Sequence, residues 1–181
     1  MILLFGGTFD PIHNGHLYIA EQAATLLNAE KVLFIPCHEP PHRPPPFFST
    51  TDRVAMLKLA INTYPNFEYS DIEINRPGPS YMIDTVKILK KIYPYETLQL
   101  LLGADAYQYF DTWLHAKEIL HFIKLCVIKR DSHTANDKNF LAIAPMKISA
   151  SDIRNRIKEG RSIDGLVPEA VKNYIFAKFT H

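Results

Sequence analysis

The sequence predicts an α/β fold, a Rossmann-like doubly wound parallel sheet in a single domain of 181 residues with a helical C-terminal portion from about residue 149. Short apolar runs without strict alternation recur along the chain, as is typical of strands buried on both faces. Helical patterns separate these runs, so right-handed crossovers place helices on both sides of the sheet. The distinctive polar segments directly follow predicted strands, where ligands bind in such folds.

In the first half of the chain, apolar runs predict strands over 1–5, 31–35 and about 67–74, with Pro36 ending the second. Apolar residues at helical spacing predict a helix over about 14–28. Thr51 or Asp52 is expected to cap the helix after the proline-rich loop 36–46, and Ser80 the helix that ends near Tyr93.

In the second half, strands are expected over 98–102, 124–128 and 141–143. The strand over 98–102 ends in Gly103-Ala-Asp105, and a helical stretch is expected to follow through Trp113, with another helix over 115–120. Ser149 can cap a helix that runs to Glu159, and Pro168 suits the first position of a last helix reaching about Phe179. The polar stretch 131–139 lacks periodicity and is interpreted as a mobile loop without assigned function.

Composition excludes several functional classes. The net charge of +1 gives no basic field for nucleic acid. No apolar run approaches the roughly 20 residues of a membrane span, and no signal-peptide pattern opens the chain. Two cysteines without CxxC spacing favour a reducing cytoplasm. Oligomeric state leaves no trace in the sequence.

The segment 6–16, Gly-Gly-Thr-Phe-Asp-Pro-Ile-His-Asn-Gly-His, lies where a strand passes into a helix. Gly6 and Gly7 lack a Cβ, so their backbone can lie directly against a phosphate. His13 and His16 are three residues apart and share one face of a helix that begins near His13. The unpaired N–H groups of that first turn attract anions. Together these features predict a polyphosphate site beside two imidazoles.

Other interpretations of these residues remain open at this level. The histidine pair could be half of a metal site or a helix cap, and with His38 and His42 it could suggest zinc, although no cysteine cluster supports that. The proline-rich loop is interpreted as a lid, with a stiff spacer or a polyproline ligand as alternatives. Taken alone, a tryptophan such as Trp113 is more often a core or surface aromatic than a platform for a substrate ring. Asp105 could be an ordinary helix cap, a role compatible with contact to substrate.

Two motifs resemble the nucleotidyltransferase superfamily that holds the HxGH motif. They are the Gly7 to His16 segment and Ile148-Ser-Ala-Ser-Asp-Ile-Arg154. Finer features resemble the bacterial nicotinate mononucleotide adenylyltransferases, over nearly the whole chain. These features are Pro-Pro-His-Arg at 40–43, Arg-Pro-Gly-Pro-Ser-Tyr at 76–81, Thr85, Gly-Ala-Asp at 103–105, and Trp113.

The resemblance implies transfer of AMP from ATP to the phosphate of nicotinate mononucleotide, with release of pyrophosphate and no covalent intermediate. An attacking phosphate is already anionic near neutral pH, so the protein must align two polyanions and stabilise developing charge. Imidazoles can do so by donating N–H bonds, more strongly if phosphates raise their pKa. The resemblance assigns catalysis to His13, His16 and Arg154.

The resemblance also divides the site between two nucleotides. ATP is expected to contact the two histidines, Arg154, and a set of loop residues: Gly6, Gly7, Thr8, Phe9, Asp10, Gly103, Asp105, Ser149 and Ser151. Nicotinate mononucleotide is expected to contact His42, Arg43, Tyr81, Thr85 and Trp113. No protein ligand is assigned to a metal, because Mg²⁺ is expected to arrive on phosphate oxygens and to keep much of its water.

Some positions depart from the family pattern. Met82 stands where many relatives have Thr, and Ala150 where Ser is frequent, so a hydroxyl is absent near each substrate. The alternatives are a sister adenylyltransferase acting on nicotinamide mononucleotide or phosphopantetheine, and a non-catalytic nucleotide-binding module. Trp113 and the 40–43 loop argue against phosphopantetheine, and the intact His13, His16 and Arg154 against a silent module.

Overall fold

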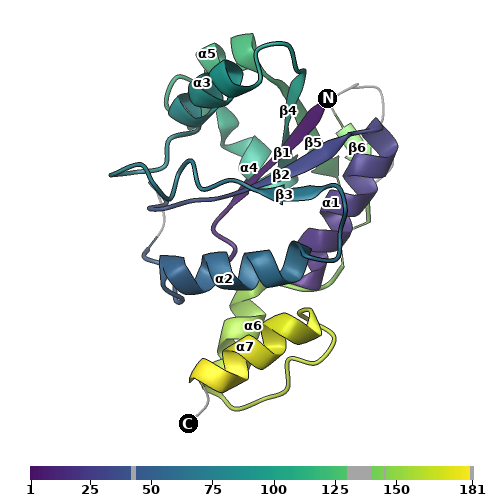
Figure 1. Cartoon of the computed structure of the whole chain (residues 1–181), viewed down its shortest axis with the longest axis vertical. Helices are drawn as coiled ribbons and strands as arrows, with labels where there is room; N and C mark the ends of the chain where they lie inside the picture. The colour runs from purple at the N-terminus through teal and green to yellow at the C-terminus, as the bar shows by residue number, and fades with distance from the viewer. Residues whose placement is uncertain (42–43, 130–139, 145, 180–181) are drawn as a thin grey trace.

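Six parallel strands form the centre of the structure, a computed structural model that describes residues 1–41, 44–129, 140–144 and 146–179 (Figure 1). Their order across the sheet is β3-β2-β1-β4-β5-β6. The strands are β1 (Ile2–Gly7), β2 (Lys31–Pro36), β3 (Phe67–Tyr69), β4 (Leu98–Gly103), β5 (Lys124–Lys129) and β6 (Phe140–Ala142). Every neighbouring pair is parallel, which confirms the predicted doubly wound fold.

The winding direction reverses between β1 and β4, which pair side by side although two strands and three helices separate them along the chain. Because successive connections leave these two strands in opposite directions, a crevice opens beyond their carboxyl ends. The Gly6–His16 segment follows β1 and the Gly103–Asp105 segment follows β4. The topology therefore brings these two segments to the same edge of the sheet.

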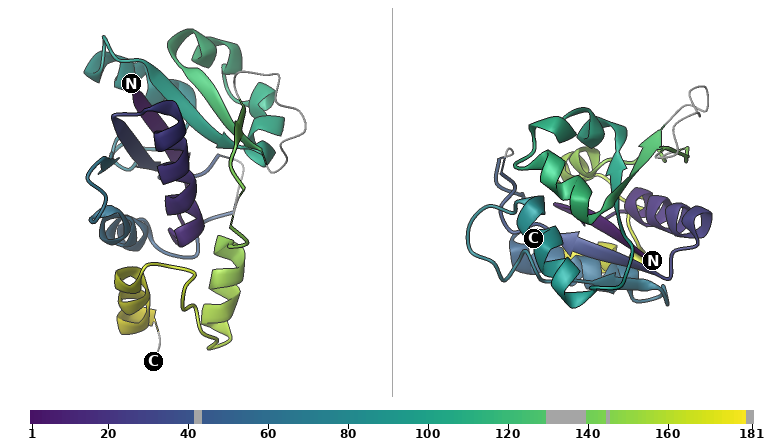
Figure 2. Two further views of the ribbon diagram at one scale, coloured as in Figure 1. Left: turned by 90° about the vertical axis from the view of Figure 1, so that its right-hand side faces the viewer. Right: turned by 90° about the horizontal axis from the view of Figure 1, so that it is seen from above.

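Helices cover both faces of the sheet (Figures 1 and 2). They are α1 (Asn14–Leu27), α2 (Thr50–Ile61), α3 (Met82–Ile92), α4 (Ala104–Gln108), the 3₁₀ turn η1 (Phe110–Thr112), α5 (Ala116–Phe122), α6 (Ala150–Lys158) and α7 (Glu169–Phe179). None of those helices combines the length and apolarity needed to cross a membrane.

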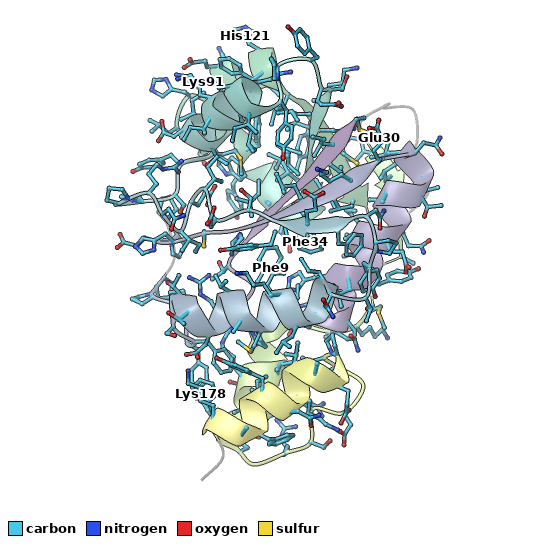
Figure 3. All side chains as sticks on the ribbon, viewed as in Figure 1. Phe9, Glu30, Phe34, Lys91, His121 and Lys178 are labelled. Atoms are coloured by element: carbon cyan, nitrogen blue, oxygen red, sulfur yellow. The ribbon has the colours of Figure 1, made fainter. Side chains whose placement is uncertain are left out.

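Two apolar cores hold these layers together. Leu3 and Phe34 face the core shared with α1, α2, α6 and α7, whereas Leu4 and Ile35 face the core shared with α3 and α5. Successive strand residues thus enter opposite cores, which is why the strands read as continuous apolar runs rather than as alternating patterns. Phe9 and Phe34 meet below the sheet with ring centroids 5.7 Å apart (Figure 3).

The last two helices, α6 and α7, lie at one end of the molecule, beneath α2 (Figures 1 and 2). Tyr174 and Lys178 of α7 reach the carboxylate of Asp52 in α2, with 2.8 Å between the Tyr174 hydroxyl and that carboxylate. Burial alone would raise the pKa of Asp52, but hydrogen bonds from Lys178, Ser49 and Tyr174 lower it. This contact fixes the helical end of the molecule against the sheet-covering helices.

Several predicted boundaries and caps are wrong. Ser49 caps α2 instead of Thr51 or Asp52, and its Oγ accepts the Asp52 N–H at 3.1 Å. Tyr81 occupies the N-cap position of α3 without a side-chain bond. Ser80 instead accepts the His38 N–H at 2.9 Å, because the loop after β2 lies against it.

The third predicted strand is also too long. It ends at Tyr69, and Ile72 to Ile74 form a turn. Pro36 is the last residue of β2 and not its stop, and Pro168 lies just before α7. The predicted helix through Trp113 breaks into α4 and η1, and the predicted mobile loop 131–139 lies outside the described residues.

Candidate active site

A cleft of about 1070 Å³ opens at the carboxyl edge of the sheet, where β1 and β4 meet. It collects most of the residues that the sequence singled out, from both ends of the chain. The predicted site residues that line it are Gly6, Gly7, Thr8, Phe9, Asp10, His16, Tyr81, Asp105, Trp113, Ser151 and Arg154. The two motif segments, far apart in sequence, therefore share one cavity.

Four predicted residues do not line this cleft. His13 lies behind His16, and Thr85 is fully buried in α3. Gly103 is the N-cap of α4 and leaves Asp105 in the first helical turn, so Asp105 is not the cap. Ser149 is the N-cap of α6, as predicted. His42 and Arg43, predicted for nicotinate mononucleotide, lie outside the described residues.

His13 and His16 cap α1 reciprocally, in the manner of a capping box. The His16 N–H donates to His13 Nδ1, and the His13 N–H donates to His16 Nδ1, each at 3.3 Å. The two rings stack with centroids 3.6 Å apart. The capping alternative considered from the sequence is therefore correct, and it holds both rings in a fixed orientation beside the cleft.

The glycine between the two histidines has a packing role. A Cβ on Gly15 would stand only 3.0 Å from His13 Nδ1, tighter than such contacts normally are. On the other side, the His16 ring meets the edge of the Phe9 ring, with centroids 5.2 Å apart. The motif therefore combines a small residue and an aromatic neighbour that together confine the two imidazoles.

Both imidazoles are neutral in this environment. Burial lowers the pKa of His13 to about 4, and burial together with the nearby His13 lowers the pKa of His16 well below 6.5. Phosphate bound beside the rings would act in the opposite direction and raise the pKa of each imidazole. Because each Nδ1 accepts a backbone N–H, the single proton of each neutral ring sits on Nε2. Each ring thus keeps one N–H donor.

Asp10 connects three parts of the site. Its carboxylate accepts the N–H groups of Phe47 and Phe48, each at 2.8 Å, at the end of the proline-rich loop. Its carbonyl accepts Arg154 Nη1 at 2.8 Å, and Arg154 Nη2 reaches the Ser151 hydroxyl at 3.2 Å. Asp10 therefore acts as a tether between the first motif, the loop and α6, and Arg154 is held facing the cleft by two acceptors.

The opposite end of the cleft is more apolar. Trp113 and Tyr81 line it and are half-buried, and Trp113 packs on Phe110 with ring centroids 5.4 Å apart. Met82 lies over the β1 end, since a Cβ on Gly6 would meet its Cε at 3.2 Å. Met82 thus contributes apolar surface between the two ends of the cleft.

Sequence reasoning missed two buried charged residues near the cleft. Glu73 lines it and is 3% exposed, and its carboxylate accepts the Thr85 hydroxyl at 2.7 Å. Burial raises the pKa of Glu73, although Thr85, Ser80 and Arg76 oppose the rise. Arg53 is fully buried behind Thr8. An acid between Ile72 and Ile74 suggests an exposed strand position, and a single arginine in a helix gives no signal of its own.

No group of three or more His, Cys, Asp or Glu side chains suited to a metal occurs in the described part of the chain. The Asp10 carboxylate is occupied by two backbone amides and forms an ion pair with Arg154, with 3.6 Å between Oδ2 and Nη1. Asp105 is the exposed acid at the cleft that remains available. This donor set fits an ion that takes most of its ligands from phosphate and water, and not a protein-built metal site.

The chain is similar to known proteins over nearly its whole length. A family model described as cytidylyltransferase-like matches residues 4–156. The chain is 40% identical to a probable nicotinate-nucleotide adenylyltransferase of Dictyoglomus thermophilum, covering 95% of this chain and 94% of the relative. It is 37% identical to the nicotinate-nucleotide adenylyltransferase of Bacillus subtilis, covering 95% and 93%.

Solved structures share the fold at lower identity. A putative nicotinate-nucleotide adenylyltransferase from Vibrio parahaemolyticus superposes with a TM-score of 0.76 at 21% identity, covering 96% of this chain and 97% of that one. The Plasmodium falciparum nicotinic acid mononucleotide adenylyltransferase complexed with NaAD gives a TM-score of 0.80 at 19% identity, covering 97% and 94%. At these identities the likeness concerns the fold.

Proposed function

Because the chain belongs to the cytidylyltransferase-like family and, within it, to the nicotinate-nucleotide adenylyltransferases, we infer that its cleft joins two nucleotides. The enzyme transfers AMP from ATP to nicotinate mononucleotide, giving nicotinate adenine dinucleotide and pyrophosphate, a step of NAD biosynthesis. The observation that carries this inference is the meeting of the 6–16 and 148–154 motifs in one cavity that also contains Trp113.

The acceptor phosphate needs no general base, since its second pKa is about 6 and it is anionic at neutral pH. Its oxygen attacks the α-phosphorus of ATP while the bond to pyrophosphate breaks, so the added negative charge ends on the leaving group. The protein's task is alignment and charge stabilisation. In this proposal the catalytic residues are His13, His16 and Arg154.

The fixed Nε2–H groups support the role of the two histidines. A neutral imidazole whose Nδ1 is occupied by the backbone can only donate from Nε2, so no proton exchange is needed before it binds a phosphate oxygen. The capping bonds hold these donors in place before substrate arrives, which lowers the reorganisation needed in the transition state.

Arg154 and the start of α6 support the proposed binding of the ATP triphosphate. Two of the guanidinium N–H groups hold Asp10 and Ser151, and the others remain available for β- and γ-phosphate oxygens. Ser151 and the capped N-terminus of α6 add a hydroxyl and backbone donors. Gly6 to Asp10 would carry the phosphate-facing backbone, with Gly103, Asp105 and Ser149 completing the proposed ATP site.

The apolar end supports binding of the pyridine ring. The flat face of Trp113 and the neighbouring Tyr81 can stack on an aromatic ring. Thr85 is too deeply buried for direct contact through its hydroxyl, so in the proposal it acts by supporting Glu73 and Tyr81 from behind. His42 and Arg43 remain proposed contacts for the mononucleotide.

Mg²⁺ is proposed as the metal that accompanies ATP, held by phosphate oxygens and water with Asp105 within the same cleft. When bound, it would neutralise charge on the triphosphate. One nucleotidyltransferase domain over residues 1–181 and a cytoplasmic location, in keeping with the cysteine usage, are retained as proposals.

Pyrophosphate release from ATP tests the function directly. The assay is run with nicotinate mononucleotide, its amide, phosphopantetheine and no acceptor. We expect the acid to be preferred by at least about tenfold in kcat/KM, a difference of about 1.4 kcal/mol. Equal use of the amide would refute the specificity. If no acceptor supports pyrophosphate release, only a nucleotide-binding module would be left.

A further inference from the structure

Arg53 of α2 is a fully buried arginine directly behind the phosphate-facing loop. Its Nη1 donates to the Thr8 carbonyl at 2.7 Å, and its Nη2 donates to the Thr50 hydroxyl at 3.1 Å and the His38 carbonyl at 3.4 Å. Thr8 itself lines the cleft. A single residue therefore separates this guanidinium from the substrate cavity.

Among the described residues, Arg53 has no ion-pair partner. Its three acceptors are uncharged, and the ion pairs among the described residues do not include it. Its Nε–H is buried and has no hydrogen-bond partner in the part of the chain that the structure describes. The adjacent acid, Asp52, is engaged by Lys178 and Tyr174 on the other side of α2. The guanidinium therefore lies in the interior without an anionic partner among the described residues, which is unfavourable until an anion binds nearby.

The bond to Thr8 also fixes a peptide group. In a planar trans peptide the C=O and the following N–H point in opposite directions. Since the Thr8 carbonyl faces Arg53, the Phe9 N–H faces away from α2. Thr8 and Phe9 both line the cleft, so Arg53 sets the orientation of a backbone donor there as well as the local charge.

We propose that Arg53 is a positioning residue that supplies buried positive charge to a nucleotide phosphate bound against Thr8. The inference rests on the proposed function, because it requires a phosphorylated ligand in this cleft. A buried charge is screened little by salt and acts through a medium of low dielectric. The cost of burying Arg53 is then offset when the anion binds, and the empty site is held ready for it.

A purely structural role predicts a different result. If Arg53 only connects α2 to the loops after β1 and β2, its loss should weaken the binding of nucleotides and of their dephosphorylated nucleosides equally. If its charge acts on a phosphate, the loss should fall on the phosphorylated ligand alone. The ratio of the two dissociation constants separates these roles.

The experiment measures binding of two ligand pairs to the full chain: nicotinate mononucleotide against nicotinate riboside, and ATP against adenosine. The single tryptophan, Trp113, lies in the cleft and gives a fluorescence signal for the pyridine pair, and calorimetry serves the adenosine pair. Arg53→Gln removes the charge and keeps an amide donor, whereas Arg53→Lys keeps the charge. Lys58→Met, an exposed cation on the same helix, is the matched control.

For a phosphate within about 8 Å, we expect Arg53→Gln to raise Kd for one nucleotide by about 30-fold and for its nucleoside by less than about twofold. The affected pair identifies which phosphate sits against Thr8. The loss should persist at high salt, because a buried charge is weakly screened. Lys58→Met should leave all four values unchanged, and Arg53→Lys should stay within about threefold of the parent ratio.

Equal losses for nucleotide and nucleoside, or no loss in a folded Arg53→Gln variant, would overturn the proposal. If that variant fails to fold by circular dichroism, a folded Arg53→Lys variant that loses phosphate selectivity would overturn it too. These outcomes differ from failure of the proposed function, in which the parent enzyme itself would neither bind nicotinate mononucleotide nor release pyrophosphate.

Discussion

The two ends of the cleft are built from different interactions. At the end where the two motifs meet, which is called the rigid end below, backbone hydrogen bonds fix the His13 and His16 rings. There Arg154 of the second motif also donates to the carbonyl of Asp10 in the first. At the opposite, apolar end, the half-buried side chains of Trp113, Tyr81 and Met82 present mainly apolar surface. Under the proposed function, the transferring phosphate would meet directional, preset donors, whereas the pyridine ring would be selected by shape and stacking.

The largest test of this contrast is His16→Ala. Removing the Nε2–H donor at the rigid end should lower kcat by about a hundredfold or more, because its contribution is made in the transition state. The KM for nicotinate mononucleotide should change little. Steady-state pyrophosphate release measures both, with circular dichroism as the control for folding. Near-normal turnover in a folded variant would show that the His16 ring does not take part in the chemical step.

A second test uses pH. The pKa of His13 is lowered to about 4, so between pH 6.5 and 4 the unfolded chain binds a proton that the native state does not. Stability is therefore unaffected well above pH 6.5 and falls as the pH drops toward 4. For His13 this amounts to about 2 kcal/mol between pH 8 and pH 5.

Urea unfolding of the parent and of His13→Gln at both pH values measures this difference. The glutamine variant should lose about 2 kcal/mol less stability between pH 8 and pH 5 than the parent, since it has no imidazole to protonate. Identical pH dependence in the two proteins would mean that His13 is not held neutral at the rigid end.

The smallest effect is expected at the apolar end. Trp113→Leu removes the stacking face and should raise KM for nicotinate mononucleotide by about tenfold, with KM for ATP and kcat within about threefold. Trp113→Phe should recover most of the loss. A fall in kcat without a change in KM would show that the apolar end contributes to catalysis and not to binding of nicotinate mononucleotide.

Motif chemistry predicted which residues meet in the cleft, and their contacts with phosphate stay a prediction. Gly6, Gly7, His16 and Arg154 all line the cleft, because a strand, a turn and a helix start are local features with strong residue preferences. The parallel sheet followed from apolar runs that enter two cores. Each of these inferences depends on short stretches of chain.

Tertiary packing decided what the sequence could not predict. Ser80 was expected to cap α3, but the loop after β2 takes its hydroxyl. Backbone amides near Thr85 were expected at the substrate, which stays a prediction, and the burial of its side chain against Glu73 could not be foreseen. Arg53 gave no signal, because only the approach of the Thr8 and His38 carbonyls makes its position special. Such contacts join segments far apart in the chain, where residue spacing carries no information.

The tether at Asp10 links events at opposite walls of the cavity. One residue holds Phe47 and Phe48 through its carboxylate and Arg154 through its carbonyl. Two distant parts of the chain, the Phe47–Phe48 backbone and α6, are therefore positioned by the same residue. A shift of the Asp10 backbone would change the wall formed by the first motif and the placement of the Arg154 guanidinium together.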